Sequence, residues 1–346
     1  MKKVLTLIFS LSMVFSTSFN VYSSEKEEKK EGEKKGEAHG EKKKEEGHVE
    51  EPGHKSTINA VSFLPDGKTI ISASDDKTIK FWEPVKGHYL KKELKGHNGH
   101  IVAMAVSKDG KILATASNDY KIKIWSLQLM KEIKTISAHF ASVNSIAFSN
   151  DSKYLVSAGG DKKVKIWETS TGKLIRTLLG SEGSVYSVTV SPNNKYIVAG
   201  GEDKLIRIWD FYTGALVKNI KKHIHSVDNV VFSKNGSYLA TSSWREIKIW
   251  NTNNWSQKSA FTGNEVSAMS FSPDETLLAS GGGYYAKSIK IWNLATKKLF
   301  HELKGSEGAV STIAFSPDGK TLISSGDENK IRYWDVENGK DKFADN

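Results

Sequence analysis

The chain has 346 residues, a formal net charge of +10, 38% hydrophobic residues, nine tryptophans and no cysteine. This apolar content is sufficient for a packed core, so a wholly disordered chain is excluded. The absence of cysteine excludes a disulfide scaffold, thiolate-ligated zinc or iron–sulfur sites, c-type haem attachment and a thiol nucleophile.

Residues 1–24 have the pattern of a secretory signal peptide. A positive start at residues 1–3 is followed by a mostly apolar run to Phe19, and Val21 and Ser23 suit the −3 and −1 positions of a cleavage site. The run is shorter than the roughly 20 residues that a membrane-spanning helix needs. We therefore expect cleavage and export to the periplasm or cell surface, with no transmembrane segment afterwards. The cysteine-free composition favours a bacterial periplasm. An uncleaved inner-membrane anchor is the alternative.

Residues 25–52 predict a disordered, Glu/Lys-rich linker. Residues 25–51 hold 11 Glu, 8 Lys and only one aliphatic side chain larger than alanine, Val49. Such a segment cannot bury enough apolar area to offset the entropy of ordering it. We expect a solvated tether. In the alternative of a periplasmic metal or stress accessory protein, the ligands would be His39, His48 and His54, although their spacing matches no compact metal site.

From residue 53 onward, one unit is repeated seven times. A tryptophan ends a strand-like run every 41–43 residues, at Trp82, Trp125, Trp167, Trp209, Trp250, Trp292 and Trp334. Each unit contains an earlier apolar strand, a turn rich in Pro, Asp, Asn and Gly, the strand pair that includes the tryptophan, and a fourth strand. Four short strands per 42 residues, with no helix-period segment, predict a radially repeated antiparallel sheet.

The units resemble WD repeats. They share a Gly-His pair, a turn such as LPDGK at residues 64–68, a Ser-x-Ser strand and a strand ending in Trp-Asp or Trp-Asn. The resemblance covers residues 53–335 and implies an all-β fold, a seven-bladed β-propeller of four-stranded antiparallel blades over residues 53–346. We expect blades to begin near residues 54, 97, 139, 181, 223, 263 and 306. Residues 340–344 are expected to close the ring, with residues 48–51 as the competing segment.

The resemblance also implies a buried polar network in the first three blades. Its residues are His54, Ser72, Asp76 and Trp82; His97, Thr115, Asp119 and Trp125; and His139, Ser157, Asp161 and Trp167. A His–Asp–Ser grouping would suggest a hydrolase, but three equivalent groupings indicate a structural repeat. We expect no catalytic residue, cofactor or metal site. A propeller enzyme of lactonase or quinoprotein type would need acidic ligands near the axis, where the inner strands offer only Asp228.

The later blades depart from this pattern. Blade 4 has Ser181 and Ala199 at the His and Ser positions, blade 7 has Ser306 and Glu328 at the His and Asp positions, and the shortened hairpin of blade 5 has lost its Asp. Sequence drift, tolerated because the closed ring is redundant, is the simplest interpretation.

Two neighbouring hairpins, in blades 5 and 6, carry large side chains where the Asp turn belongs. With the preceding loop of blade 5, they place a set of candidate partner-binding residues on one rim, namely His225, Trp244, Arg245, Tyr284 and Tyr285. Trp, Tyr and Arg are enriched in binding hot spots. The alternative is that these rings fold down over the gaps left by the missing network.

The charge has two parts. The total of +10, less the two signal lysines and without the −3 of the linker, leaves +11 on the propeller. One basic residue lies two positions before each repeat tryptophan, and we expect these side chains to be solvated or to snorkel. The remaining lysines lack the arginine clusters and interleaved aromatics of a nucleic-acid site, although they would suit contact with an anionic surface. The sequence therefore predicts a non-enzymatic scaffold that binds protein partners.

Overall fold

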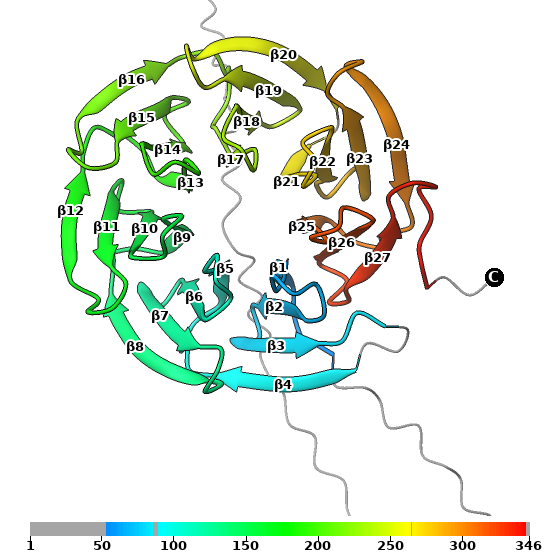
Figure 1. Ribbon diagram of the computed structural model, residues 1–346, viewed down its shortest axis with the longest axis horizontal. Coiled ribbons are helices and arrows are strands. Elements are labelled where there is room, and N and C mark those ends of the chain that lie inside the picture. Colours follow the sequence, from blue (N-terminus) through cyan, green and yellow to red (C-terminus); the bar gives the residue numbers. More distant parts are fainter. Residues whose placement is uncertain (1–52, 86–88, 264, 344–346) are drawn as a thin grey trace, which may run out of the picture. The chain divides into compact units, whose positions relative to one another are not determined.

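The structure is a computed structural model of the full chain, and it describes residues 53–85, 89–263 and 265–343. The predicted signal peptide and linker lie outside the described residues. Within the described part, the named elements are 27 strands in seven antiparallel sheets, arranged as blades around a central axis (Figure 1). The predicted fold class, an all-β seven-bladed propeller, is confirmed.

Each blade is built from consecutive strands, ordered from the axis outward. Blade 1 has β1 (Ile58–Phe63), β2 (Ile70–Ser74), β3 (Thr78–Trp82) and β4 (Leu90–Lys95). Blade 2 has β5 (Ile101–Val106), β6 (Ile112–Ser117), β7 (Lys121–Ser126) and β8 (Lys131–Ser137). Blade 3 has β9 (Val143–Phe148), β10 (Tyr154–Gly159), β11 (Val164–Glu168) and β12 (Leu174–Leu178). Blade 4 has β13 (Val185–Val190), β14 (Tyr196–Gly201), β15 (Ile206–Asp210) and β16 (Leu216–Ile220).

The last three blades follow the same order. Blade 5 has β17 (Asn229–Phe232), β18 (Tyr238–Ser243), β19 (Glu246–Asn251) and β20 (Ser256–Thr262). Blade 6 has β21 (Val266–Phe271), β22 (Leu277–Gly282), β23 (Ser288–Asn293) and β24 (Lys298–Lys304). Blade 7 has β25 (Val310–Phe315), β26 (Thr321–Gly326) and β27 (Arg332–Asp335).

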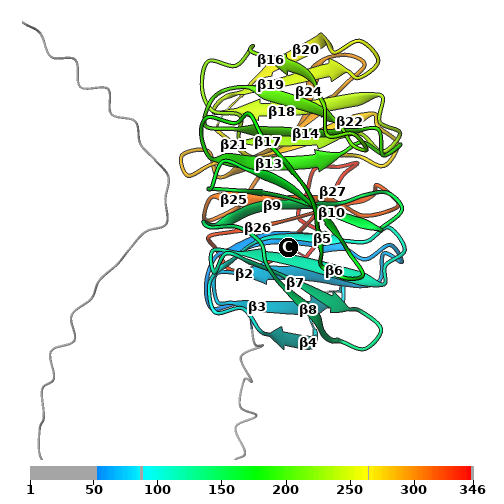
Figure 2. The same ribbon diagram turned by 90° about the vertical axis from the view of Figure 1, so that its left-hand side faces the viewer.

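The strands run between two rims of the ring (Figure 2). Because consecutive strands are antiparallel, the loop that leads into each blade and the hairpin between its second and third strands lie on one rim, here named the hairpin rim. The turns after the first and third strands lie on the other, here named the turn rim. Any residue of a leading loop is therefore on the same side as the hairpins.

The core lies between the blades, and the repeat tryptophan packs against the preceding blade. Trp167 of blade 3 shares a buried cluster with Ile122 and Ile124 of blade 2. The same contact closes the ring, because Trp82 of blade 1 lies in one cluster with Tyr333 of blade 7. Middle strands such as β6 and β7 are buried along most of their length, which explains their continuous runs of apolar and small residues.

Ring closure uses the C-terminal tail, within blade 7 itself. Asp341 forms an antiparallel bridge with Trp334, and the Lys342 backbone N–H donates to the Tyr333 carbonyl at 2.7 Å. Residues 341 and 342 thus pair with β27. Residue 344 and the competing residues 48–51 lie outside the described part, so the choice between the two closing segments stays a prediction. At the seam itself, the Val61 backbone N–H donates to Thr312 Oγ1 at 3.0 Å.

A contact between neighbouring turns repeats around the turn rim. The turn after the first strand holds a residue with positive φ, and in four blades this residue is glycine. At each of these glycines an added Cβ would lie 3.1–3.6 Å from the Cδ of a proline in the preceding blade. The pairs are Gly67–Pro317, Gly110–Pro65, Gly236–Pro192 and Gly319–Pro273. An added side chain would press against the proline ring at Gly110 and Gly236, where this distance is 3.1–3.2 Å, and would make an ordinary contact with it at Gly67 and Gly319.

In the turns of blades 3, 4 and 6, both the glycine and the proline of the preceding blade that it would face are replaced. Their positive-φ residues are Ser152, Asn194 and Glu275, and the preceding turns have Lys108, Asn150 and Lys234 in place of proline. Without the ring, a side chain fits and the backbone N–H is available. Asn194 Oδ1 accepts the N–H of Asn150, which stands at the proline position, at 2.7 Å. Glu275 accepts the N–H of Asn235, one residue after the proline position. The residue chosen in one turn therefore depends on the neighbouring blade.

This dependence can be measured with Asn150→Pro. The change removes the N–H that Asn194 accepts and places a ring against the Asn194 side chain, so we expect a loss of about 1–3 kcal/mol in the free energy of unfolding. Adding Asn194→Gly recreates the pair found in four other blades and should recover most of that loss. Urea unfolding of both single variants and the double variant measures the coupling. Strict additivity would contradict the account.

Candidate functional site

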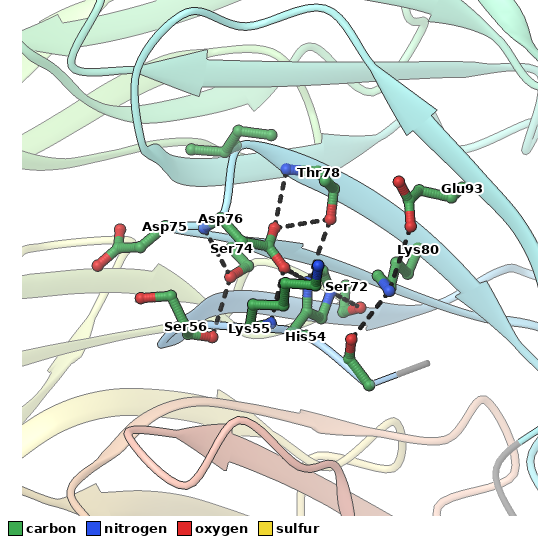
Figure 3. A network of polar contacts seen from close by, with 12 residues as sticks. His54, Lys55, Ser56, Ser72, Ser74, Asp75, Asp76, Thr78, Lys80 and Glu93 are labelled. Atoms are coloured by element: carbon green, nitrogen blue, oxygen red, sulfur yellow. Dashed lines mark hydrogen bonds and ion pairs between the residues drawn. The ribbon is translucent and has the colours of Figure 1, made fainter. Parts of the chain in front are cut away.

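The polar network of blade 1 ties the leading loop to the hairpin and the tryptophan (Figure 3). His54 Nδ1 lies 2.7 Å from Asp76 Oδ2, and His54 Nε2 lies 2.7 Å from Ser72 Oγ. The Trp82 indole N–H donates to the same Ser72 Oγ at 2.7 Å. The Asp76 carboxylate also accepts the backbone N–H of Lys55 at 3.0 Å. The carboxylate therefore binds the loop through both a side chain and the backbone.

Blades 2 and 3 repeat this geometry. The structure brings His97, Thr115, Asp119 and Trp125 together at 2.8–2.9 Å, and His139, Ser157, Asp161 and Trp167 at 2.7–2.8 Å. The indole N–H occupies one lone pair of the hydroxyl oxygen, so the hydroxyl proton points to Nε2 of a neutral imidazole. Nδ1–H is then the donor to the carboxylate. Every donor has one acceptor, and no group is left over for chemistry.

The pKa values agree with this assignment. Burial lowers the pKa of His97 and His139, and the hydrogen bonds to their aspartates offset only part of that effect. Burial alone would raise the pKa of Asp119, but its hydrogen bonds with His97 and with backbone N–H groups bring the pKa below its usual range. The network therefore holds a neutral histidine against an ionised aspartate near neutral pH.

The blade 5 hairpin has lost its Asp, but a glutamate completes the network in its place. His223 Nδ1 lies 3.1 Å from Glu246 Oε2, while His223 Nε2 and the Trp250 indole both contact Thr241 Oγ1, at 2.8 and 2.9 Å. The shorter hairpin removes the Asp turn, and the longer glutamate reaches back from the first position of β19. Burial lowers the pKa of His223 to about 4.

Blades 4 and 7 are also compensated rather than eroded. Arg207 Nη1 binds Asp203 Oδ2 at 2.7 Å, and the Arg332 guanidinium binds Glu328 at 2.8–2.9 Å. In both blades serine replaces the network histidine, and arginine replaces the lysine found two residues before the tryptophan elsewhere. A guanidinium supplies the donors that the imidazole would have given. The structure thus gives the carboxylate of both blades a new partner, and sequence drift as the origin of the substitutions stays a prediction.

The basic position before each tryptophan is therefore mostly internal, which corrects the expectation of solvated side chains. Five of the seven residues are buried, namely Lys80, Lys123, Lys165, Arg207 and Lys248. Their charged groups are held by carboxylates or by carbonyls of the leading loops, as where Lys165 Nζ donates to the Ala138 carbonyl at 2.6 Å. These buried and paired positive charges therefore contribute little to the electrostatic potential at the protein surface.

Blade 6 differs from the rest. Its Trp292 indole still donates to Ser280 Oγ at 3.0 Å. Its lengthened hairpin, however, has Tyr284 and Tyr285 at the place of the network acid. Among the described blades it is the one in which no carboxylate takes the role of the network acid, since in blade 5 Glu246 of β19 takes that role.

The side chains predicted to bind a partner form what we name the aromatic patch, comprising His225, Trp244, Arg245, Tyr284 and Tyr285. The His225 and Trp244 ring centres lie 5.0 Å apart at 77°, and the Arg245 guanidinium carbon lies 4.8 Å from the Trp244 ring centre. The two tyrosine rings contact each other edge-to-face at 5.5 Å. Trp244 is 47% exposed, Tyr284 60% and Tyr285 76%. The rings stand in solvent, contrary to the alternative that they fold down.

The loop leading into blade 6 connects the two hairpins of the aromatic patch. The Val266 backbone N–H donates to the Trp244 carbonyl at 2.7 Å, and the Gly263 N–H donates to the Arg245 carbonyl at 2.9 Å. On the other side of the loop, the Gly283 N–H donates to the Glu265 carbonyl at 3.1 Å. The leading loop of blade 6 therefore hydrogen-bonds to both hairpins that carry the patch.

Known families match almost the whole described chain. The family model described as "IFT122 first beta-propeller" matches residues 142–345, more than half of the chain, and the model described as "WD domain, G-beta repeat" matches residues 47–83 and 88–126. The chain belongs to the WD-repeat β-propellers.

Curated relatives of this WD-repeat protein match over short segments. It is 37% identical over 75 residues to "Small ribosomal subunit protein RACK1y" of Oryza sativa subsp. japonica, covering 22% of either chain. It is 32% identical over 93 residues to "B-type cell cycle switch protein ccs52B" of Medicago truncatula, covering 27% of this chain and 19% of the relative. The match to human "Apoptotic protease-activating factor 1" is 35% over 97 residues, 8% of that protein. The chain thus spans about a fifth of the first relatives.

Two exposed residues on the hairpin rim of this WD-repeat propeller were missed by the sequence interpretation. Phe140 is 85% exposed and Ile224 is 76% exposed, and each directly follows a network histidine. The corresponding residues in blades 1, 2 and 4 are Lys55, Asn98 and Glu182. An apolar residue at a position that is otherwise polar was the available signal. Ile224 adjoins His225 and therefore extends the aromatic patch.

The described residues contain no group of three or more His, Asp or Glu side chains arranged to hold a metal ion. Nor do they contain a helix long and apolar enough to cross a membrane.

The neutral state of His223 predicts a pH-dependent stability. Its pKa is about 4 when folded and 6.5 by its ordinary value, so between these pH values the unfolded chain binds a proton that the folded chain does not. The stabilisation from this group is therefore lost as the pH falls from 6.5 toward 4. We expect the difference in unfolding free energy between wild type and His223→Asn to shrink by about 2 kcal/mol from pH 7 to pH 4.5. A difference that does not change with pH would refute the assignment.

The exchange of histidine for arginine can be tested in blade 4. Arg207→Lys should destabilise the protein by about 1–3 kcal/mol, because the lysine leaves Asp203 without its close partner. Arg176→Lys, on exposed outer strand β12, is the matched control and should change stability by less than about 0.5 kcal/mol. The triple variant Ser181→His, Ala199→Ser, Arg207→Lys recreates the blade 3 network and should recover stability. Thermal unfolding that ranks the triple variant below Arg207→Lys would contradict the exchange.

Proposed function

We propose that this protein is a non-enzymatic scaffold that captures a protein partner with the aromatic patch on its hairpin rim. The observation that carries the proposal is the exposure of Trp244, Tyr284 and Tyr285 on the hairpins of two neighbouring blades, both of which hydrogen-bond to the leading loop of blade 6. Each ring offers a large, stiff contact area at a low cost in side-chain entropy. Trp, Tyr and Arg are also the residues that most often dominate protein–protein binding energy.

The backbone beneath the patch supports the same function. Asp228 Oδ2 accepts the Trp244 backbone N–H at 3.1 Å, and Ser226 Oγ donates to Asp228 Oδ1 at 2.7 Å. Together with the leading loop of blade 6, these bonds fix the tryptophan in a left-handed conformation, with φ of 47°. A pre-ordered surface loses little entropy when it binds.

The chemistry of the rest of the molecule favours binding over catalysis. The histidine–carboxylate pairs are buried and have all their donors matched, so a substrate has no access to them. The curated relatives include proteins named as a ribosomal subunit protein and a cell cycle switch protein. These names describe those proteins, and the short matches support a common use of WD propellers in assemblies rather than a shared partner.

We further propose that the scaffold works outside the cytoplasm, in the periplasm or at the cell surface. The support is the signal-peptide pattern of residues 1–24. The partner would then be an envelope or secreted protein, brought to a propeller on a charged tether. Fractionation of cells making the protein tests this location, and a mature form that remains cytoplasmic would reject it.

The binding site is tested by the double variant Trp244→Ala, Tyr285→Ala. We expect partner capture from an envelope fraction to fall by at least about tenfold, because truncating two central aromatics removes several kcal/mol of binding energy. The melting temperature should remain close to that of wild type, since both side chains are exposed.

Tyr120→Ala is the matched control for this experiment. Tyr120 is a half-exposed tyrosine on the blade 2 hairpin of the same rim, and we expect its removal to leave capture unchanged. Full capture by the stably folded double variant would reject the aromatic patch as the partner site. Equal losses in the double variant and the control would show that the rim acts without a defined centre.

A further inference from the structure

Arg245 stands apart from the other arginines of the chain. Arg207 and Arg332 bind carboxylates at 2.7–2.8 Å, and Arg176 donates to the Tyr212 carbonyl at 3.3 Å. Within the described residues, Arg245 has neither an ion pair nor a hydrogen-bond acceptor for its guanidinium. Its one side-chain contact of note is the stack on Trp244. A guanidinium with five unused donors is therefore held on the surface.

The stack leaves those donors usable. A guanidinium that lies over an aromatic ring satisfies its face and keeps its N–H groups directed outward in its own plane. The backbone of Arg245 is fixed by the Gly263 N–H, and the Trp244 ring beneath it is contacted by His225. The planar fork suits two oxygens of one carboxylate or phosphate, which it binds with two parallel hydrogen bonds.

The nearby carboxylates are committed elsewhere. Glu246 binds His223 and Lys248, and Asp228 accepts hydrogen bonds from the Trp244 backbone and Ser226 while burial raises its pKa. Glu265 lies toward the blade 6 hairpin, where its Oε2 would be 2.5 Å from a Cβ on Gly283. An anionic ligand is therefore attracted to the Arg245 side of the patch and repelled from the Glu265 side.

Basic and apolar groups complete the surface. Lys287 Nζ donates to the Glu307 carbonyl at 2.8 Å and lies 6.0 Å from the Tyr284 ring centre. Tyr284, Tyr285 and Ile224 provide exposed apolar area on the same rim, in the blade of the arginine and in the next blade. A ligand that fills this surface has one oxyanion and neighbouring apolar side chains.

We infer that Arg245 determines partner specificity, by binding a carboxylate or phosphate of a protein segment whose adjacent apolar side chains pack on Trp244 and the two tyrosines. The inference rests on the proposed function, since it names the chemistry of the segment that the aromatic patch captures. The proposed ligand is an acidic protein segment rather than an anionic lipid or polysaccharide. A peptide can present one carboxylate or phosphate to Arg245 and, from neighbouring residues, apolar side chains to the exposed aromatic rings.

The probe is a display library of random 12-residue peptides, selected on the full-length protein. We expect the enriched peptides to have Asp or Glu within about three residues of Leu, Ile, Phe or Trp. Synthetic copies should bind Arg245→Gln about tenfold more weakly than wild type, and Arg176→Gln, the control on the outer strand, as tightly as wild type. Melting temperatures verify that both variants fold.

A double-mutant cycle separates a direct contact from a structural effect. Replacing the peptide's acidic residue by its amide should weaken binding to wild type about tenfold and leave binding to Arg245→Gln unchanged. Phosphoserine at that position distinguishes the two sources of the oxyanion, and retention of the Arg245 dependence by either one supports the inference. Enriched peptides without an acidic residue, or a peptide whose amide form loses equal affinity for both proteins, would overturn it.

The remaining outcomes distinguish this inference from the proposed function. If peptides lose binding to Trp244→Ala, Tyr285→Ala but not to Arg245→Gln, the aromatic patch is the binding site and the inference fails. If enriched peptides bind all variants equally, the patch itself is rejected. Arg245-dependent binding to phosphatidylglycerol vesicles, with no peptide enriched, would overturn the inference in favour of a membrane surface.

Discussion

A buried carboxylate joins the leading loop of a blade to its hairpin, and most of the structure depends on this one interaction. In blades 1–4 and 7 the carboxylate accepts a backbone N–H from the loop, at distances from 2.9 Å at Asp203 to 3.5 Å at Glu328. In blade 5 Glu246 binds the loop through His223. Burying a charge is costly unless its hydrogen bonds are satisfied, so the second partner of the carboxylate is as important as the carboxylate itself. Histidine fills that role in four blades and arginine in two.

The architecture could be predicted from the sequence because each blade corresponds to one copy of a repeated sequence unit. Tryptophans every 41–43 residues, turn residues between apolar strands and the absence of helical periodicity are local features that survive drift. The networks of the first three blades followed from the resemblance to WD repeats, since each position had the family's residue.

What the sequence did not reveal depends on side-chain length and on neighbours in space. Glu246 does not stand at the position of the network aspartate in the repeat. It completes the blade 5 network because its side chain is longer, which compensates for the shorter hairpin. The paired change of histidine to serine and lysine to arginine became meaningful only when Arg207 was found against Asp203. The proline–glycine pairs of the turn rim join residues of different repeats, so aligning the repeats with one another hides them. The burial of the basic residues two positions before each tryptophan was missed for the same reason, because it depends on the adjacent blade.

A rigid ring with compensated networks leaves its hairpins free to vary without loss of the fold. Blade 6, which has no carboxylate at the network position, carries two exposed tyrosines there, and blade 5, whose carboxylate has moved to β19, carries Trp244 and Arg245 on the vacated hairpin. In this proposal the partner is bound by side chains of the blade 5 and blade 6 hairpins that take no part in the polar networks. The repeated geometry of the other blades supports these two hairpins.

The central claim, that these freed hairpins bind the partner, is tested most directly by photo-crosslinking from single positions. A photoreactive phenylalanine analogue at position 285 is compared with the same residue at position 120, on the regular hairpin of blade 2. The account predicts one discrete adduct from position 285 that Arg245→Gln diminishes, and none from position 120. An identical adduct from both positions, or an adduct from position 120 alone, would contradict it.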